Sequence, residues 1–342
     1  MLPTTMIAVQ LTGHGGTENL FYNEAVPVPV PGPDDVLIRV TAAGINNTDI
    51  NTRIGWYSKT GKAEDAGWTG TPLQLPRIQG ADGSGRIVAA GANVPPIRIG
   101  ERVIVRTMMP GQTPYDLVTL GSELDGAFAQ YLSVPAIHAF KVECDWSDAE
   151  LASIPCAYST AENLLTRADV KAERVLITGA SGGVGTAAVQ LAKRRGAEVI
   201  AICATDKADD LRALGADMTI PRHADLAAIL GHDSVDAVID VVAGPQFPAL
   251  LDVLRRSGRY AVSGAIAGPL VTLDVRTLYL KDLTLIGCTL QSDTVFRNLV
   301  AYIERGEIRP LISRTYPLRD IARAQEDFTA KRFTGKLVLE IP

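Results

Sequence analysis

The sequence is poor in the two residue types that most often build disulfide frameworks and metal centres. Only four cysteines and four histidines occur among its 342 residues. The scattered cysteines give no disulfide framework and favour a reducing compartment, and the histidines form no cluster. We therefore expect a cytoplasmic protein whose fold needs no disulfide; its cysteines are Cys144, Cys156, Cys203 and Cys288.

Other absences exclude further classes of protein. No run of about 18 apolar residues occurs, so the sequence predicts no membrane span. No run of Lys and Arg exceeds three residues and the formal net charge is −5, so a nucleic-acid partner is not expected. The first residues lack both the charged and the apolar segment of a signal peptide.

The most informative segment that is present covers residues 174–203. An apolar run leads into a glycine-rich turn with the spacing A-x-G-x-x-G, and an amphipathic helix and a second apolar run follow. Glycines at this spacing permit a tight turn, a close approach of the backbone to a pyrophosphate, and close packing of helix on strand. Free N–H groups at the helix start would then face the anion. The pattern predicts a dinucleotide site, rather than a glycine turn without a ligand, at Gly182, Gly183, Val184 and Gly185.

The chain changes character near residue 154. Residues 1–153 contain short β-like runs between Gly/Pro turns, which indicates an antiparallel, barrel-like β domain. Residues 154–291 alternate apolar strands with helices, which predicts an α/β, doubly wound parallel sheet. Residues 292–342 end in a strand with no place in that sheet, so we expect them to rejoin the first domain. The parallel strands are expected at 174–179, 198–203, 235–242, 259–263 and 283–287.

Six short segments, in order along the chain, carry a family resemblance. They are residues 31–40, 43–49, 80–85, 100–103, the glycine turn, and 335–339. Together they resemble the medium-chain dehydrogenase/reductase superfamily over nearly the whole chain. The resemblance implies a Rossmann nucleotide-binding domain and a split GroES-like β-barrel catalytic domain, with the active site between them.

The resemblance also implies where a catalytic zinc would be bound. Alcohol dehydrogenases of this superfamily use a Cys, a His followed by a Glu, and a later Cys; this chain has Asn46, Ala81, Asp82 and Cys156 at those positions. One thiol cannot replace the three protein ligands of a catalytic zinc. No cysteine lies between Val103 and Glu143, where a structural zinc would need four. We expect a metal-free protein, similar to the zinc-independent quinone oxidoreductase-like branch.

A metal-free site favours one kind of substrate. An unactivated alcohol would lose its Lewis acid. A conjugated carbonyl can accept a hydride at its β-carbon and delocalise the charge onto oxygen, so the protein need only position it and donate hydrogen bonds. Quinones and α,β-unsaturated carbonyl compounds both fit this requirement.

Four residues are candidates for the catalytic and substrate-binding roles. Asn46 can donate through its amide or, alternatively, order its loop. Thr48 matches a relay hydroxyl of alcohol dehydrogenases, although it can equally be a turn residue. Tyr57 matches a Gly-x-Tyr of quinone oxidoreductases, and its phenol could reach the substrate oxygen or the ribose, or pack as an aromatic. Cys156 is expected to line the pocket as a small apolar group, because no adjacent base is visible.

The polar stretch 58–75 is long for a connection in this domain. Loops of this length without structure of their own are often lids or binding loops. We expect a lid on the substrate side; an inert surface loop or an oligomer contact are the alternatives.

The expected cofactor is NADPH, with NADH as the less favoured choice. NAD sites usually carry an acid about 20 residues past the glycine turn, and the second strand here ends without one. By resemblance, Thr205 and Lys207 match positions that meet the 2′-phosphate. Further positions matched by resemblance to cofactor contacts are Thr160, Gly264 and Lys336.

We expect a homodimer, since the resemblance implies pairing of sheet-edge strands and residues 283–290 offer an uncharged apolar edge. The expected partners are therefore a second copy and a small quinone or enone. A reductase of another carbonyl and a non-catalytic NADPH-binding protein remain alternative functions.

Overall fold

The computed structural model describes residues 2–111, 113 and 116–342. These form two compact units. Unit 1 comprises Met1–Cys156 and Phe296–Pro342, and unit 2 comprises Ala157–Val295. The sequence-based domain boundaries were 153/154 and 291/292, three or four residues earlier at each junction.

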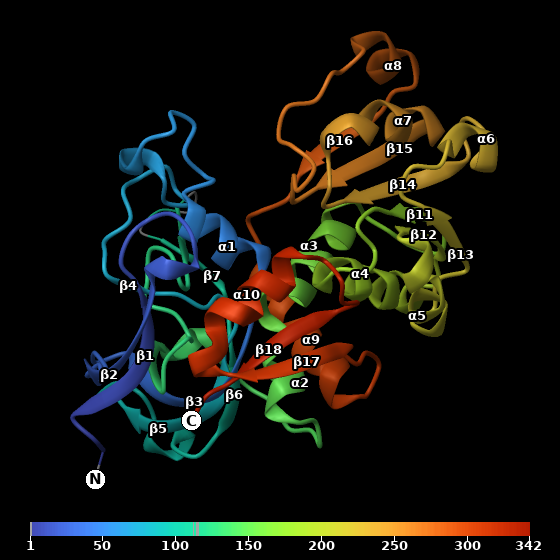
Figure 1. Ribbon diagram of the computed structural model, residues 1–342. Helices are drawn as coiled ribbons and strands as arrows, with labels where there is room; N and C mark the ends of the chain where they lie inside the picture. Colours follow the sequence, from blue (N-terminus) through green and yellow to red (C-terminus); the bar gives the residue numbers. More distant parts are fainter. Residues whose placement is uncertain (1, 112, 114–115) are drawn as a thin grey trace. The chain divides into compact units, whose positions relative to one another are not determined.

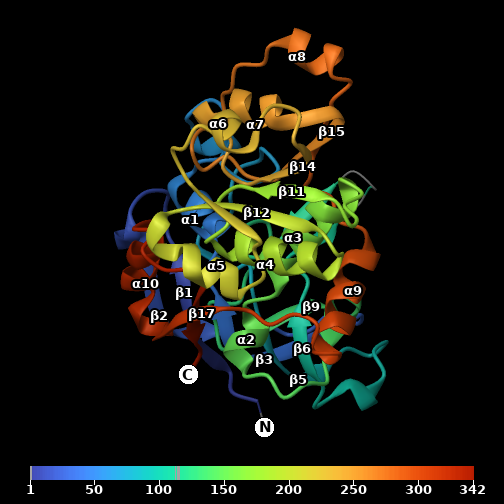
Figure 2. The same ribbon diagram turned by 90° about the vertical axis from the view of Figure 1, so that its right-hand side faces the viewer.

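Unit 2 is a six-stranded parallel sheet in the order β13-β12-β11-β14-β15-β16. The order reverses direction at β11, as in a doubly wound fold. Within this unit, α4 and α5 lie on one face of the sheet and α6 and α7 on the other (Figures 1 and 2). The strands are β11 (Arg174–Ile177), β12 (Glu198–Cys203), β13 (Met218–Pro221), β14 (Val235–Asp240), β15 (Leu254–Val262) and β16 (Thr284–Gly287).

The helices of unit 2 begin and end where local sequence directs them. The amphipathic helix α4 buries seven of its residues against the sheet. Asp225 and Asp274 cap short helices by accepting backbone N–H bonds in the first turn. The helices are α3 (Pro155–Arg167), which crosses the unit boundary, α4 (Gly183–Arg194), α5 (Ala208–Ala213), α6 (Leu226–Leu230), α7 (Phe247–Val253) and α8 (Val275–Leu280).

Two differences from the sequence-based strands have clear causes. Strand β13 was not predicted, because it is a four-residue edge strand with one buried side chain and thus lacks an apolar run. Strand β15 begins at Leu254 instead of 259, since α7 ends at Val253 and the chain turns directly into the sheet.

Unit 1 is built on a seven-stranded sheet in the order β10-β6-β5-β3-β18-β17, with β9 also paired to β3. Its core is a cluster of buried, mostly aliphatic side chains from the strands of this sheet and from the N-terminal strands. A three-stranded sheet (β2-β1-β4) and a hairpin (β7-β8) complete the unit. The strands that form the large sheet are β3 (Asp35–Gly44), β5 (Ser84–Ala90), β6 (Arg102–Val105), β9 (Tyr131–Pro135), β10 (Ala139–Lys141), β17 (Ile312–Pro317) and β18 (Lys336–Glu340).

The remaining elements of unit 1 are short. The helices are α1 (Asn47–Ile54), α2 (Asp148–Ala152), α9 (Asp293–Glu304) and α10 (Ile321–Thr329), of which α9 begins in unit 2. The other strands are β1 (Thr5–Leu11), β2 (Leu20–Pro27), β4 (Arg77–Ile78), β7 (Met108–Pro110) and β8 (Leu117–Thr119).

The C-terminal segment completes the sheet of unit 1. Strand β18 lies between β3, to which it is antiparallel, and β17, to which it is parallel. Residues 338–340 are thereby paired with residues 42–44, shortly before α1 begins (Figure 1). The end of the described chain thus contributes a central strand of the N-terminal unit. Over the described residues, no helix combines the length and apolarity that crossing a membrane requires.

Candidate active site

The glycine turn of unit 2 has the geometry of an anion site. The first helical bond of α4 runs from the Thr186 N–H to the Gly182 carbonyl (2.8 Å), so the three N–H groups before it have no intrahelical acceptor. A Cβ on Gly185 would lie 2.3 Å from the Gly179 oxygen, whereas one on Gly182 would touch nothing closer than 3.5 Å. Gly185 is therefore required for packing, and the space at Gly182 is open to a ligand. These residues fit a dinucleotide pyrophosphate.

The carboxyl ends of the neighbouring strands are tied together by Asp240. This fully buried side chain accepts bonds from the Thr178 and Tyr260 hydroxyls and from the Val242 N–H (2.7 Å). Gly264 follows β15 at the same edge, where an added Cβ would lie 2.8 Å from the Val241 oxygen. Asp240 thus holds the edge at which ligands of doubly wound sheets bind.

The residues expected at the cofactor's 2′-phosphate follow β12. Thr205 is exposed, whereas Lys207 is only 5 % exposed. Burial lowers the pKa of the Lys207 ammonium, and the positive charge of Arg222 lowers this pKa further. Arg222 directly follows β13, whose last residue pairs with Cys203. Two cations therefore lie near the carboxyl ends of β12 and β13, and a bound anion would stabilise this arrangement of charges. Thr160 lies buried on α3.

In unit 1, Asn46, Asp82 and Lys336 form a buried polar centre. The Lys336 ammonium donates to Asn46 Oδ1 (2.6 Å), Asp82 Oδ2 (2.8 Å) and the Ile45 carbonyl (3.0 Å). The Asn46 amide donates to Asp82 Oδ2 (2.8 Å), and Asp82 Oδ1 accepts the Cys156 N–H (2.6 Å). A Cβ on Gly44 would lie 2.5 Å from Asp82 Oδ2, so only glycine fits there.

Lys336 was expected to contact the cofactor, and the structure gives its ammonium three protein acceptors. Asp82 and Lys336 are 0 % and 2 % exposed. An ammonium has three N–H donors, so a cofactor contact would require one of these bonds to be exchanged. The contact stays a prediction.

Asp49, on α1, is bonded to two of the segments that form this centre. Its carboxylate accepts the backbone N–H groups of Asn46 (2.8 Å) and Ala81 (3.0 Å), which ties the two sequence segments together. Burial raises the pKa of the Asp49 carboxyl to about 7, and the neighbouring Asp82 charge adds to the increase. Asp49 is therefore a structural carboxyl with an unusual pKa.

Tyr57 and Thr48 form a second polar group. Their hydroxyl oxygens are 3.0 Å apart, and Asn51, one turn after Thr48, also interacts with the phenol. Burial raises the pKa of Tyr57 to about 12, with smaller contributions from the charges of Cys156 and Asp49. The phenol is thus a protonated donor at neutral pH, and the structure brings it together with Thr48.

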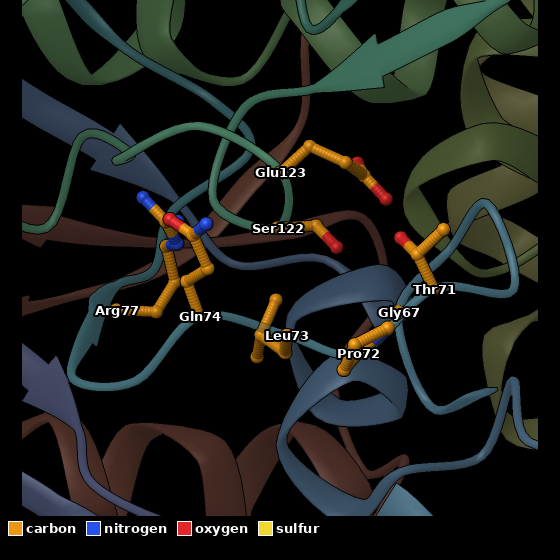
Figure 3. A pocket seen from close by; sticks show the side chains of 8 residues that line it. All are labelled: Gly67, Thr71, Pro72, Leu73, Gln74, Arg77, Ser122 and Glu123. Carbon is orange, nitrogen blue, oxygen red and sulfur yellow. The ribbon is translucent and has the colours of Figure 1, made fainter. Parts of the chain in front are cut away.

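The 58–75 stretch is held against this group. The Trp68 ring stacks on the Tyr57 ring with centroids 5.2 Å apart, and Asp65 accepts the backbone N–H groups of Lys59 (2.9 Å) and Thr60 (3.1 Å). The segment also borders a pocket of about 190 Å³, which none of Asn46, Tyr57 and Cys156 lines. Figure 3 shows the side chains of this pocket, which come from residues 67–77 and from Ser122 and Glu123. The lid stays a prediction, now with Trp68 as its contact to Tyr57.

The donor set of unit 1 does not fit a catalytic zinc. The positions equated with zinc ligands present an amide at Asn46, a methyl group at Ala81 and one thiol at Cys156, and the Lys336 ammonium lies against Asn46 and Asp82. An ammonium has no lone pair to offer a metal and repels a cation. Within the residues that the structure describes, no cluster of three or more His, Cys, Asp or Glu could hold a metal ion.

Sequence reasoning missed three features of these candidate sites. Arg222 follows an unpredicted strand. The joint role of Asp82 and Lys336 depends on a contact between residues 254 positions apart. Trp68 contacts Tyr57 from a loop whose sequence has no hydrophobic periodicity. Of the three, Arg222 alone had a local sequence signal, namely its positive charge directly after β13.

Two family models match the chain. The one described as "Alcohol dehydrogenase GroES-like domain" matches residues 32–144, and the one described as "Zinc-binding dehydrogenase" matches residues 183–305.

Relatives are similar over the whole chain. The quinone oxidoreductase of Homo sapiens is 30 % identical, with 98 % of this chain and 97 % of the relative covered. The acryloyl-coenzyme A reductase of Sulfurisphaera tokodaii is 29 % identical, with 95 % and 98 % covered. A structure described provisionally as an alcohol dehydrogenase from Sinorhizobium meliloti 1021 is 45 % identical, covers 100 % of this chain and 98 % of its own, and gives a TM-score of 0.91.

Proposed function

The chain belongs to the medium-chain dehydrogenase/reductase superfamily and is quinone oxidoreductase-like, and we propose that it is an NADPH-dependent, metal-independent reductase of quinones or α,β-unsaturated carbonyl compounds. Membership makes it an oxidoreductase that uses a nicotinamide cofactor. The substrate class, the choice of NADPH and the independence from zinc are the proposal.

One observation carries the proposal. The centre formed by Asn46, Asp82 and Lys336 contains an ammonium and an amide where the metal-dependent branch has metal ligands. Such a site can donate hydrogen bonds to an oxygen, but its donor set does not supply a Lewis acid. Conjugated carbonyl compounds are the substrates that need only hydrogen-bond donors, because their charge is delocalised during reduction.

The chain's own residues have distinct roles in this proposal. When bound, NADPH supplies the hydride. The Tyr57 phenol, kept protonated by its raised pKa and oriented by Thr48, donates to the substrate oxygen. The second N–H of Asn46 has only a 3.4 Å contact with the Gly44 carbonyl and is the other available donor. The Trp68 ring stacks on the Tyr57 ring and so helps to hold the phenol in place.

The choice of NADPH is supported by the end of β12 and β13. Lys207 and Arg222 bring two positive charges to this edge, and no acid ends β12. The nearby Asp206 and Asp210 offset these charges in part. The 2′-phosphate of NADPH would neutralise the remaining positive charge, whereas the ribose hydroxyl of NADH would not.

A homodimer in the cytoplasm is part of the proposal. Strand β16 is an edge of the parallel sheet, with Leu285 38 % exposed. Within unit 2, α8 lies on the connection that leads into this strand (Figures 1 and 2), and its Tyr279 is 60 % exposed. An unpaired apolar edge of this kind favours pairing with a second copy.

The test is NADPH consumption with a panel of quinones and enones and their saturated ketone counterparts. We expect turnover of the conjugated compounds only, unaffected by a chelator. Turnover of saturated ketones, lost on chelation, would favour an alcohol dehydrogenase. Tight NADPH binding without turnover of any compound would favour a non-catalytic binding protein.

A further inference from the structure

Two of the four positions equated with the metal site, Asn46 and Asp82, are bound by a cation that belongs to the chain, the ammonium of Lys336. Asp82 binds the Cys156 N–H with one oxygen and both Asn46 and Lys336 with the other. Ala81 precedes Asp82 directly, and its N–H is bound by Asp49. The ammonium of Lys336 therefore places a positive charge in direct contact with two of the positions equated with the metal site.

Donor and acceptor chemistry fixes the orientation of Asn46. An ammonium can only donate and a carboxylate can only accept, so Oδ1 must face Lys336 (2.6 Å) and Nδ2 must face Asp82 (2.8 Å). Rotation of the amide by 180° would set N–H groups against an ammonium. The amide therefore has one orientation, in which its second N–H makes only the long 3.4 Å bond to the Gly44 carbonyl, a bond that a substrate oxygen could replace.

The same bond strengthens Asn46 as a donor. Donation from a cation to Oδ1 withdraws electron density from the amide, which makes its N–H groups stronger donors, and the low polarity of a buried site increases the effect. Asn46 is 6 % exposed, so water screens this coupling little. The charge of Lys336 is thereby felt at the second N–H of Asn46.

We propose that Lys336 replaces the metal cation of the related dehydrogenases as a positioning residue: it orients and polarises Asn46, which in turn stabilises the substrate oxygen. Lys336 touches neither the substrate nor the cofactor in this role. The role of Asn46 in this proposal rests on the proposed function. The prediction that the ammonium prevents metal binding does not rest on it.

The kinetic test compares Lys336→Met, Lys336→Arg, Asn46→Ala and the double variant Lys336→Met/Asn46→Ala, with the exposed Lys171→Met as a matched control. We expect Lys336→Met to lower kcat for an enone on the order of 100-fold with little change in the KM for NADPH, because one oxyanion donor is weakened. Lys336→Arg should recover part of kcat. The double variant should be no slower than Asn46→Ala alone, since Lys336 acts through Asn46.

Contrary results are equally clear. A rise of tenfold or more in the KM for NADPH with kcat unchanged would assign Lys336 to the cofactor and overturn the proposal. Multiplicative losses in the double variant would show that the two residues act independently, which also overturns it.

A second measurement does not depend on turnover. Asn46→Cys/Ala81→His supplies a second thiolate and an imidazole beside Cys156, and it is prepared with and without the further substitution Lys336→Met. Co²⁺ alone is the probe. We expect thiolate-to-cobalt absorption only in the triple variant, which lacks the ammonium. Equal Co²⁺ binding by the double and triple variants would refute a metal-replacing role of Lys336, even if the enzyme reduces enones. If instead the Co²⁺ result is as expected but the wild-type enzyme does not reduce enones, the proposed function is refuted.

Discussion

The hydroxyl oxygen of Tyr57 lies 3.0 Å from that of Thr48, and the Tyr57 ring is stacked on Trp68. Thr48 belongs to α1, Tyr57 follows that helix, and Trp68 comes from the long loop, so three successive segments fix one phenol. The polar centre around Lys336 and this phenol are both within unit 1. The side chains on which the proposed chemistry depends, Tyr57 and the polar centre around Lys336, are therefore positioned by contacts within unit 1.

Removing the Tyr57 hydroxyl should lower catalysis more than stability. We expect Tyr57→Phe to reduce kcat for an enone on the order of 100-fold, because one donor to the developing oxyanion is lost while the stacked ring is kept. Steady-state kinetics, with thermal unfolding as a check on folding, measures the effect. Tyr279→Phe, on an exposed helix of unit 2, is the control. An unchanged kcat would remove Tyr57 from the mechanism.

The raised pKa of Asp49 predicts a distinct pH dependence of stability. Its pKa is about 7 in the folded protein and 3.8 in the unfolded chain, so the unfolded state loses its proton first as pH rises. The contribution of Asp49 to the free energy of unfolding should therefore fall between pH 4 and 7, by about 4 kcal/mol at 1.4 kcal/mol for each pH unit.

Urea unfolding of the wild type and of Asp49→Asn across this range checks the prediction. The difference between the two curves should change steadily from pH 4 to 7. Asp65→Asn serves as a control, because a hydrogen bond from Ser58 lowers the pKa of Asp65 to about 2. Its stabilisation is lost only in more acidic solution, so its difference from the wild type should change little between pH 4 and 7. Parallel curves for wild type and Asp49→Asn would contradict the raised pKa.

Cofactor preference should depend on both cations beside β12. Lys207→Ala and Arg222→Ala should each weaken NADPH binding about tenfold and leave NADH binding nearly unchanged, since a charge-assisted bond contributes roughly 1.5–3 kcal/mol. Titration calorimetry with both cofactors measures the change, and Arg256→Ala, which is paired with Asp282 at the surface, is the control. Equal dissociation constants for the two cofactors in the wild type would refute the assignment.

The dimer should depend on the edge strand β16. Leu285→Lys places a charge on an edge that pairing would bury, so we expect the dimer to dissociate at micromolar concentration while cofactor binding is retained. Sedimentation velocity gives the answer. Ile97→Lys, at an equally apolar but more exposed position of unit 1, should remain dimeric. A monomeric wild type would end this proposal.

The sequence predicted the features that depend on neighbouring residues. The glycine turn, the alternation of unit 2 and the apolar edge at β16 all arise from spacing within about 30 residues, and periodicity reports such spacing well. Asn46 and Tyr57 were found through short local patterns. The joint centre of Asp82 and Lys336 could not be found this way, because a pairing across 254 residues leaves no periodic trace.

The bond between Lys336 and Asn46 joins positions 290 residues apart, and all of unit 2 is encoded between them. A ribosome that has released the first 156 residues has therefore made the amide and the carboxylate of the polar centre without their cation. Until β18 emerges and enters the sheet between β3 and β17, Asp82 has no lysine to neutralise it. Unit 1 is therefore completed only after all of unit 2 has been synthesised, and a nascent chain stalled before residue 336 would lack the cation of its polar centre.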